Sequence, residues 1–97
     1  MKSVLITCNM ILSDEVLELL DHLDLRGYTR WDDVKGRGSN KGEPHLGSHI
    51  WPALNSAFMV ILPEEKVDPL FDGIKTIEEG GSQQGIRAFV WGVERMI

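Results

Sequence analysis

Two short segments of this chain, residues 56–62 and 86–93, carry apolar side chains at nearly every position. Successive residues of a strand point to opposite faces of its sheet. In the first segment, Phe58 and Val60 would face one side and Met59 the other. A sheet with one wet face alternates apolar with polar residues, and these segments do not. The chain must therefore cover both faces of any sheet that contains them.

Two amphipathic segments can cover one of these faces. Residues 13–26 begin with Ser13, a residue type favoured at helix N-caps, and precede Gly27, which can adopt the left-handed conformation that ends a helix. Residues 64–79 form the second predicted helix. The predicted apolar stripes are Val16, Leu17, Leu19, Leu20 and Leu23 in the first helix, and Val67, Leu70, Phe71, Ile74 and Ile77 in the second.

Two more strand-like segments, residues 3–9 and 28–35, complete the pattern. The alternation in the second is imperfect, which predicts a bulge near Asp32 and Asp33. The order of elements is β-α-β-β-α-β, which indicates an α+β, ferredoxin-like fold. In that fold both helices cover one face of a four-stranded antiparallel sheet. A chain of 97 residues forms one core, so residues 1–97 are expected to be a single domain.

The sheet face without helices needs a second cover, because its strands are apolar there as well. An exposed apolar face of this kind marks an interaction surface. We therefore expect this face to pack against other copies of the chain. The alternative is that the long segment after the second strand folds back over it.

Composition excludes several classes of function. The net charge of −5 argues against nucleic-acid binding, which needs a basic face. No apolar run approaches the roughly 20 residues of a membrane-spanning helix, and Cys8 is the only cysteine. We therefore expect a cytoplasmic protein without direct membrane insertion. Catalysis is not expected, because adjacent Asp32 and Asp33 would face opposite ways and Cys8 lies in an apolar strand.

Residues 36–47 are rich in glycine and polar residues and are expected to continue no regular element; they open a longer loop-like segment, residues 36–54. Loops of about a dozen residues without secondary structure are usually functional or disordered. Two cations and a hydroxyl on a glycine-rich backbone suit recognition of a phosphate or carboxylate, and the alternative is a solvated loop. The candidate anion-binding residues in this segment are Gly36, Arg37, Gly38, Ser39 and Lys41.

The same segment carries two histidines, His45 and His49, four residues apart. Imidazole nitrogens are common metal ligands, and this spacing would allow both side chains to reach one divalent ion. Glu43 is close enough in sequence to add a carboxylate. No third ligand follows at a recognisable spacing, so the alternative that these histidines bind nothing stays open.

Residues 27–42 resemble the second strand and the T-loop base of the PII signal-transduction proteins. They contain Gly-Tyr-Thr, then Val-Lys-Gly-Arg-Gly, then Lys-Gly, where that family has Gly-x-Thr, Val-Lys-Gly-x-Gly and Lys-Gly. Residues 89–95 are similar to the family's Phe-Val-x-x-Val-x-Arg. The order of elements matches over the whole chain.

The resemblance implies a homotrimer whose sheets face inward, with sites for ATP or ADP in the clefts between subunits. Thr29 would lie near the base or ribose of the nucleotide. Arg87 would stand where the family has a phosphate-binding lysine. Residues 79–86 depart from the family's Thr-Gly-x-x-Gly-x-Gly pattern before that lysine, which marks a divergent member.

These patterns together predict a trimeric PII-like regulator that senses a small ligand, such as an adenine nucleotide, between its subunits. The T-loop-like segment at 36–54 would control a membrane transporter, and its histidines favour transport of metal ions. One alternative is a metal-binding, CutA-like trimer that uses His45 and His49 as ligands. The other is an interaction module that binds no ligand.

Overall fold

The computed structural model describes residues 1–37, 44–45, 54–80 and 85–97. Its strands are β1 (Lys2–Asn9), β2 (Tyr28–Val34), β3 (Gly36–Arg37), β4 (Pro44–His45), β5 (Asn55–Leu62) and β6 (Ile86–Gly92). Its helices are α1 (Ser13–His22) and α2 (Val67–Gly80), preceded by the short 3-10 turns η1 (Met10–Leu12) and η2 (Glu64–Lys66). No helix among these residues is both long and apolar enough to cross a membrane.

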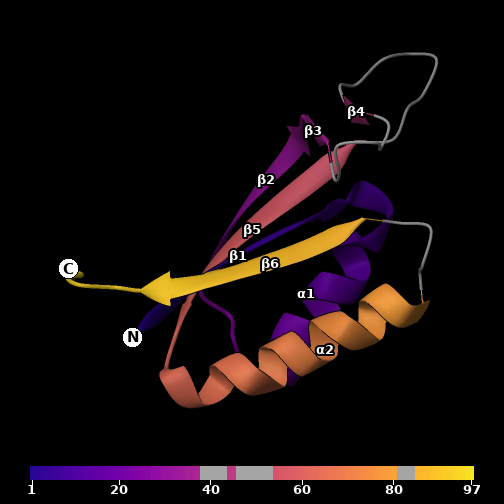
Figure 1. The fold of residues 1–97 in the computed structure, drawn as a ribbon. Coiled ribbons are helices and arrows are strands. Elements are labelled where there is room, and N and C mark those ends of the chain that lie inside the picture. Colours follow the sequence, from indigo (N-terminus) through magenta and orange to yellow (C-terminus); the bar gives the residue numbers. More distant parts are fainter. Residues whose placement is uncertain (38–43, 46–53, 81–84) are drawn as a thin grey trace.

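Four strands form one antiparallel sheet in the order β2-β5-β1-β6. Both helices lie against one face of this sheet, and both ends of the chain lie at one end of it (Figure 1). The predicted α+β, ferredoxin-like fold is therefore confirmed. The edge strands of the sheet are β2 and β6, and each carries a residue of the candidate site.

The core lies between the sheet and the helices. The middle strands β1 and β5 contribute alternate residues, and both helices contribute the stripes that their sequence pattern predicts. The buried members are Val4, Ile6, Cys8, Leu12, Val16, Leu20, Leu25, Phe58, Val60, Leu62, Leu70, Ile74 and Ile86, with Leu17, Leu19, Leu23, Val67, Phe71 and Ile77 packed against them.

The two helices approach each other closely where α2 carries a glycine. A Cβ added at Gly73 would overlap the side chain of Leu19 on α1. Glycine in a helix interior costs roughly 1 kcal/mol relative to alanine. Its presence in α2 is explained by this close helix–helix contact.

Both predicted ends of the first helix are wrong. Ser13 is the first helical residue and not its N-cap, because η1 runs directly into α1 and leaves the N-cap to Leu12, which makes no side-chain capping bond. The helix ends at His22, well before Gly27. Asp24 takes the left-handed conformation instead, with φ of 59°. The early turn lets Leu25 enter the core, where it is 6% exposed.

The bulge predicted near Asp32 and Asp33 is confirmed, because the pairing of β2 with β5 shifts between Trp31 and Val34. Asp33 has φ of 58°, in the left-handed region that an aspartate tolerates better than most residues. The prediction that residues 36–47 continue no regular element is wrong at one place, since β3 and β4 pair as a short antiparallel ladder.

The sheet face without helices is apolar, as the sequence predicts. Residues that pair directly across strands share a face, and one such row runs from Thr29 through Met59 and Leu5 to Phe89. We call this side of the sheet the open face. Its large apolar members with the highest exposure are Trp31, Ile61, Phe89 and Trp91, which are between 37% and 46% exposed.

Candidate functional site

Two segments are expected to hold a ligand: residues 36–54 and the residues just before Arg87. Both adjoin the sheet at the same end. The N–H of Asn9 donates to the carbonyl of Gly85 (2.8 Å), and the N–H of Met10 donates to the carbonyl of Leu54 (2.7 Å). The ends of these two segments therefore lie beside the end of β1 (Figure 1). We call this the loop end of the molecule.

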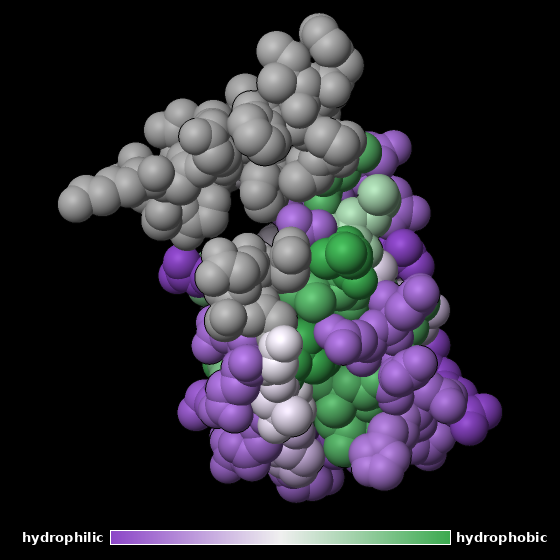
Figure 2. Space-filling view, turned by 90° about the vertical axis from the view of Figure 1, so that its right-hand side faces the viewer, coloured by the Kyte–Doolittle hydropathy of each residue, from purple (hydrophilic) through white to green (hydrophobic). Residues whose placement is uncertain are grey.

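The loop end also carries exposed apolar residues. Met10 is 41% and Ile11 70% exposed, both in η1. Figure 2 views the molecule from the side on which the loops leave, and shows an apolar band between hydrophilic borders. The surface beside the predicted anion site therefore carries both apolar and hydrophilic residues.

The base of the predicted anion site is held by a close backbone approach. Gly36 lies in β3, and a Cβ added there would come within 3.2 Å of the side-chain nitrogen of Asn55. Glycine at this position therefore lets β3 pass beside the start of β5. Arg37 follows in the same short strand. The other candidates in this segment, Gly38, Ser39 and Lys41, lie outside the described residues.

The two remaining candidates, Thr29 and Arg87, share the open face but lie at its opposite edges. Thr29 is in β2, and Arg87 is in β6, where it pairs with Thr7. Three strand spacings of about 4.8 Å separate β2 from β6, or about 14 Å. Met59 and Leu5 continue the row of Thr29 toward Phe89, whereas Arg87 lies in the adjacent row, with Thr7 and Ala57. One chain therefore does not bring Thr29 and Arg87 together.

Arg87 is an exposed residue near the loop end of β6. Its guanidinium carbon lies 5.6 Å from the ring centroid of Phe89, two residues along the same strand. Such a cation–π contact holds the side chain over the open face. The guanidinium is thereby placed at the edge of the sheet.

The predicted metal site is only partly within the described residues. His45 lies in β4, whose backbone pairs with β3, and His49 lies outside the described residues. Across the part of the chain that the structure describes, no group of three or more His, Cys, Asp or Glu side chains could hold a metal ion. The metal site at His45 and His49 stays a prediction.

A polar network at the base of the bulge was not predicted from the sequence. The hydroxyl of Ser13 donates to Ser56 Oγ (2.9 Å), and Ser56 Oγ donates to Asp32 Oδ1 (3.1 Å). Arg30 Nε donates to the same carboxylate oxygen (2.8 Å), and its guanidinium lies over the ring of Phe58. Asp32 therefore ties the bulged end of β2 to a fully buried serine of β5.

Cys8 lies beside this network and behaves as predicted, as a small buried residue. It is 2% exposed. Burial raises the pKa of its thiol from 9.0 to about 11, although the Arg30 charge and a hydrogen bond with Ser13 act in the opposite direction. The thiol is therefore protonated at neutral pH and is a poor nucleophile.

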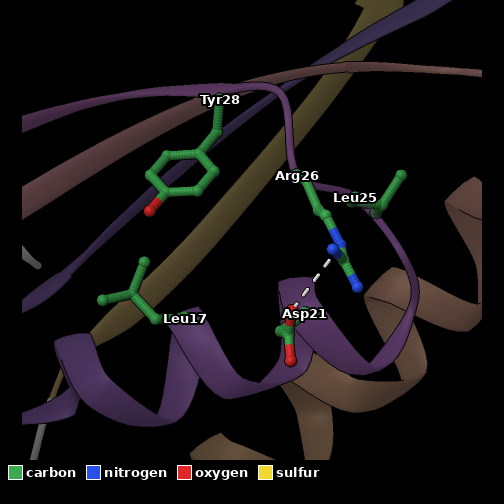
Figure 3. Close-up of a pocket in the computed structure, with 5 residues that line it drawn as sticks. All are labelled: Leu17, Asp21, Leu25, Arg26 and Tyr28. Carbon is green, nitrogen blue, oxygen red and sulfur yellow. Dashed lines mark ion pairs between the residues drawn. The ribbon is translucent and has the colours of Figure 1, made fainter.

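A pocket lies between α1 and the start of β2, on the helix side of the sheet (Figure 3). Its lining residues are Leu17, Asp21, Leu25, Arg26 and Tyr28. None of the described residues that the sequence singled out for ligand binding is among them. Thr29, next to Tyr28, faces the other side of the sheet.

The family model for nitrogen regulatory protein P-II matches residues 1–97 of this chain. The chain therefore belongs to the P-II family. A search of curated proteins finds no match.

Solved structures of PII-like proteins share the fold. CPII from Thiomonas intermedia K12 bound to ADP and bicarbonate is 24% identical, with a TM-score of 0.72 over 97% of this chain and 88% of that one. The same protein bound to ADP, AMP and bicarbonate has a TM-score of 0.73, at the same identity and coverage. A PII-like signaling protein of Thermus thermophilus is 23% identical, with a TM-score of 0.65 over 93% of this chain and 83% of that one.

Proposed function

We propose that this P-II family chain is a homotrimeric regulator that binds an adenine nucleotide, such as ADP or ATP, in the clefts between its subunits. It acts in the cytoplasm and controls a membrane transport protein through residues 36–54. The proposal assigns the chain no catalytic step. The proposal goes beyond membership of the P-II family, which the match over residues 1–97 establishes.

The placement of Thr29 and Arg87 carries this proposal. Both face the same side of the sheet, but from its opposite edges and in adjacent rows, with Met59, Leu5, Ala57 and Thr7 of the middle strands between them. A polar ligand that spanned them on one chain would lie across a largely apolar surface. The interfaces of a ring join two different surfaces, and in the ring we propose these are the β2 edge of one copy and the β6 edge of the next. Thr29 of one copy and Arg87 of another then line a single cleft.

The open face supports assembly of such a ring. Trp31, Ile61, Phe89 and Trp91 are large apolar residues exposed on one side of the sheet. Monomeric soluble proteins rarely expose contiguous apolar patches of more than a few hundred Å². Packing this face against the same face of other copies removes it from water and stabilises a domain of only 97 residues.

The ligand class is supported by the relatives and by the charge at the cleft. CPII structures are described as bound to ADP and bicarbonate, or to ADP, AMP and bicarbonate. Arg87 supplies a guanidinium, which binds phosphate through charge-assisted, often bidentate hydrogen bonds. We therefore choose ADP as the first probe, with bicarbonate as a second.

The control of a transport protein is assigned to residues 36–54, the T-loop-like segment. The short ladder of β3 and β4 closes its base at the loop end. Arg87 in β6 lies at that same end, because Gly85 just before it pairs with Asn9. A ligand at Arg87 of one copy therefore lies close to the loop base of the next.

Light scattering combined with calorimetric titration tests the proposal. We expect a mass of three times 10.9 kDa and binding of ADP. Arg87→Ala is expected to weaken ADP binding by about tenfold to a hundredfold, since hydrogen bonds to charged groups contribute about 1.5–3 kcal/mol. Lys75→Ala removes an exposed cation on α2 and should leave the affinity unchanged. A monomeric wild type, or equal affinity in Arg87→Ala and Lys75→Ala, would refute the proposed site.

A further inference from the structure

One large exposed side chain of the open face, Trp31, lies apart from the others. Trp31 is 46% exposed and belongs to β2, the strand at one edge of the sheet. Phe89 lies in a row farther from the loop end, and Ile61 and Trp91 lie in a row farther still. Among the described residues of the open face, the indole of Trp31 is therefore the exposed aromatic group nearest to the loop end.

The row that contains Trp31 differs from the two rows beyond it. It runs from Trp31 through Ala57 and Thr7 to Arg87. Its two middle members are small, whereas the next row has large aliphatic side chains at the same positions. Ala57 and Thr7 therefore offer little apolar surface for another copy to cover. This row places an aromatic ring at one edge of the sheet and a cation at the other.

The fold defines the place of Trp31 along its strand. Thr29, two residues earlier, faces the same side of the sheet, because alternate residues of a strand share a face. Directly after Trp31 the pairing of β2 with β5 shifts, and Asp33 takes the left-handed conformation. A bulge of this kind interrupts regular pairing and re-aims nearby side chains. Thr29 and Trp31 are therefore neighbours on the edge strand, just before the chain reaches the loop base at Gly36.

The chemistry of this row matches the two ends of a nucleotide. Aromatic side chains bind bases by stacking, which needs only the flat face of each ring. A guanidinium binds phosphate through charge-assisted hydrogen bonds. An adenine nucleotide carries a base at one end and phosphates at the other. Trp31 is suited to the first end and Arg87 to the second.

We infer that Trp31 of one copy stacks on the base of the nucleotide whose phosphates bind Arg87 of the next copy. The inference rests on the proposed function and takes the axis of the ring to run along the strands. Rotation about such an axis moves no residue along the strands. Trp31 and Arg87 share a row, so they stay at one level when they come from different copies. Trp31 is then the residue that selects a ligand with a base.

Calorimetric titration with two probes tests the stacking. The probes are ADP and inorganic pyrophosphate, which has phosphates but no base. Trp31→Ala should weaken ADP binding by about fivefold to a hundredfold, the scale of base–aromatic stacking, and should leave pyrophosphate binding unchanged. Trp31→Phe keeps an aromatic face and should retain most of the affinity for ADP. Equal ADP affinity in Trp31→Ala and wild type, or an equal loss for both probes, would overturn the inference.

Fluorescence gives a second readout that does not depend on the strength of binding. The chain has three tryptophans, so Trp51→Phe combined with Trp91→Phe leaves Trp31 as the only one. Saturating ADP should quench its emission, because a stacked purine quenches an indole. The matched protein, Trp31→Phe with Trp51→Phe, retains Trp91 and should keep its emission. Unchanged emission from Trp31, or equal quenching in the two proteins, contradicts the stacking.

Light scattering separates a role in binding from a role in assembly. Trp31→Ala should keep the trimeric mass, because the apolar rows with Phe89, Ile61 and Trp91 are intact. A Trp31→Ala protein that is monomeric where the wild type is trimeric would place the indole in the contact between copies. That result would overturn the inference.

The proposed function and the stacking fail in different ways. A wild-type trimer that binds no ADP removes the nucleotide site, and the stacking with it. A trimer whose ADP affinity falls in Arg87→Ala but not in Trp31→Ala keeps the proposed function and removes the stacking alone. A loss in Trp31→Ala but not in Arg87→Ala keeps a base contact at the β2 edge and removes the cleft shared with Arg87.

Discussion

The network at the base of the bulge gives a prediction whose size follows from burial. Ser56 is fully buried, and its hydroxyl donates to Asp32 Oδ1 over 3.1 Å while accepting from Ser13. Asp32→Ala removes the acceptor and leaves this donor unpaired. A buried donor left without a partner costs about 1–3 kcal/mol.

Asp32→Ala also breaks the ion pair with Arg30, but the loss of this pair contributes less to the expected loss of stability. The Arg30 and Asp32 side chains are 31% and 52% exposed, so water can replace their bond. Partly exposed ion pairs of this kind contribute about 0–1 kcal/mol. Arg30 also keeps its position over the ring of Phe58. We therefore assign most of the expected loss of stability to the Ser56 hydroxyl.

Thermal unfolding at a fixed protein concentration measures the effect, because the Tm of an associating protein depends on concentration. In a domain of this size, 1 kcal/mol shifts Tm by about 4–8 °C. Asp32→Ala should therefore lower Tm by at least about 4 °C. Asp32→Asn keeps a carbonyl oxygen as the acceptor and should lose less than half as much. Equal losses in the two variants would show that the charge, and not the acceptor, is what stabilises the bulge.

Two more predictions concern the helix contact and the buried thiol. Gly73→Ala should lower the free energy of unfolding by about 1 kcal/mol, as overpacking against Leu19 outweighs the gain in helix propensity. In a Leu19→Ala background the same change should raise it by about 1 kcal/mol, and equal effects in the two backgrounds in urea unfolding would contradict the close contact. Because burial raises the pKa of Cys8 from 9.0 to about 11, the thiol ionises first in the unfolded chain. Stability should therefore fall as pH rises from 9 toward 11, more steeply than in Cys8→Ala, and parallel pH profiles in the two proteins would argue against the raised pKa.

The sequence predicts the elements and their faces well because both depend on local periodicity. The stripe of α2 identifies its core-facing residues without any tertiary knowledge, whereas β5 is apolar on both faces and its sequence indicates only that both faces are covered. The bulge was visible as a break in the alternation of residues 28–35 at Asp32 and Asp33. These features follow from the periods of 3.6 and 2 residues, which a sequence carries directly.

The errors arise where a tertiary contact overrides a local preference. Ser13 has the chemistry of an N-cap, but its hydroxyl bonds Ser56, which is 43 residues away. Gly27 has the chemistry of a helix end, but the chain turns at Asp24, and the N–H of Leu25 donates to the carbonyl of Leu20 (2.8 Å). Neither partner can be read from the residues next to these positions.

The candidate residues, and their placement between subunits, come from the sequence and the resemblance and stay predictions; the structure adds where Thr29, Gly36 and Arg87 lie within one chain. Gly36 was predicted as part of an anion site, and its close approach to Asn55 explains the glycine by geometry alone. Thr29 and Arg87 were assigned to one ligand by resemblance. Their positions on opposite edges follow from the strand order β2-β5-β1-β6.

The proposed cyclic assembly would account for three features of the single chain. It would cover the open face, bring the β2 edge beside the β6 edge, and unite Thr29 of one copy with Arg87 of the next. A ligand that binds only between copies stabilises their contact by mass action. Gly36, at the loop base, follows β2 at that same edge. In the proposed ring, binding at the cleft would act on residues 36–54 from the neighbouring β6 edge, without a signal through the core.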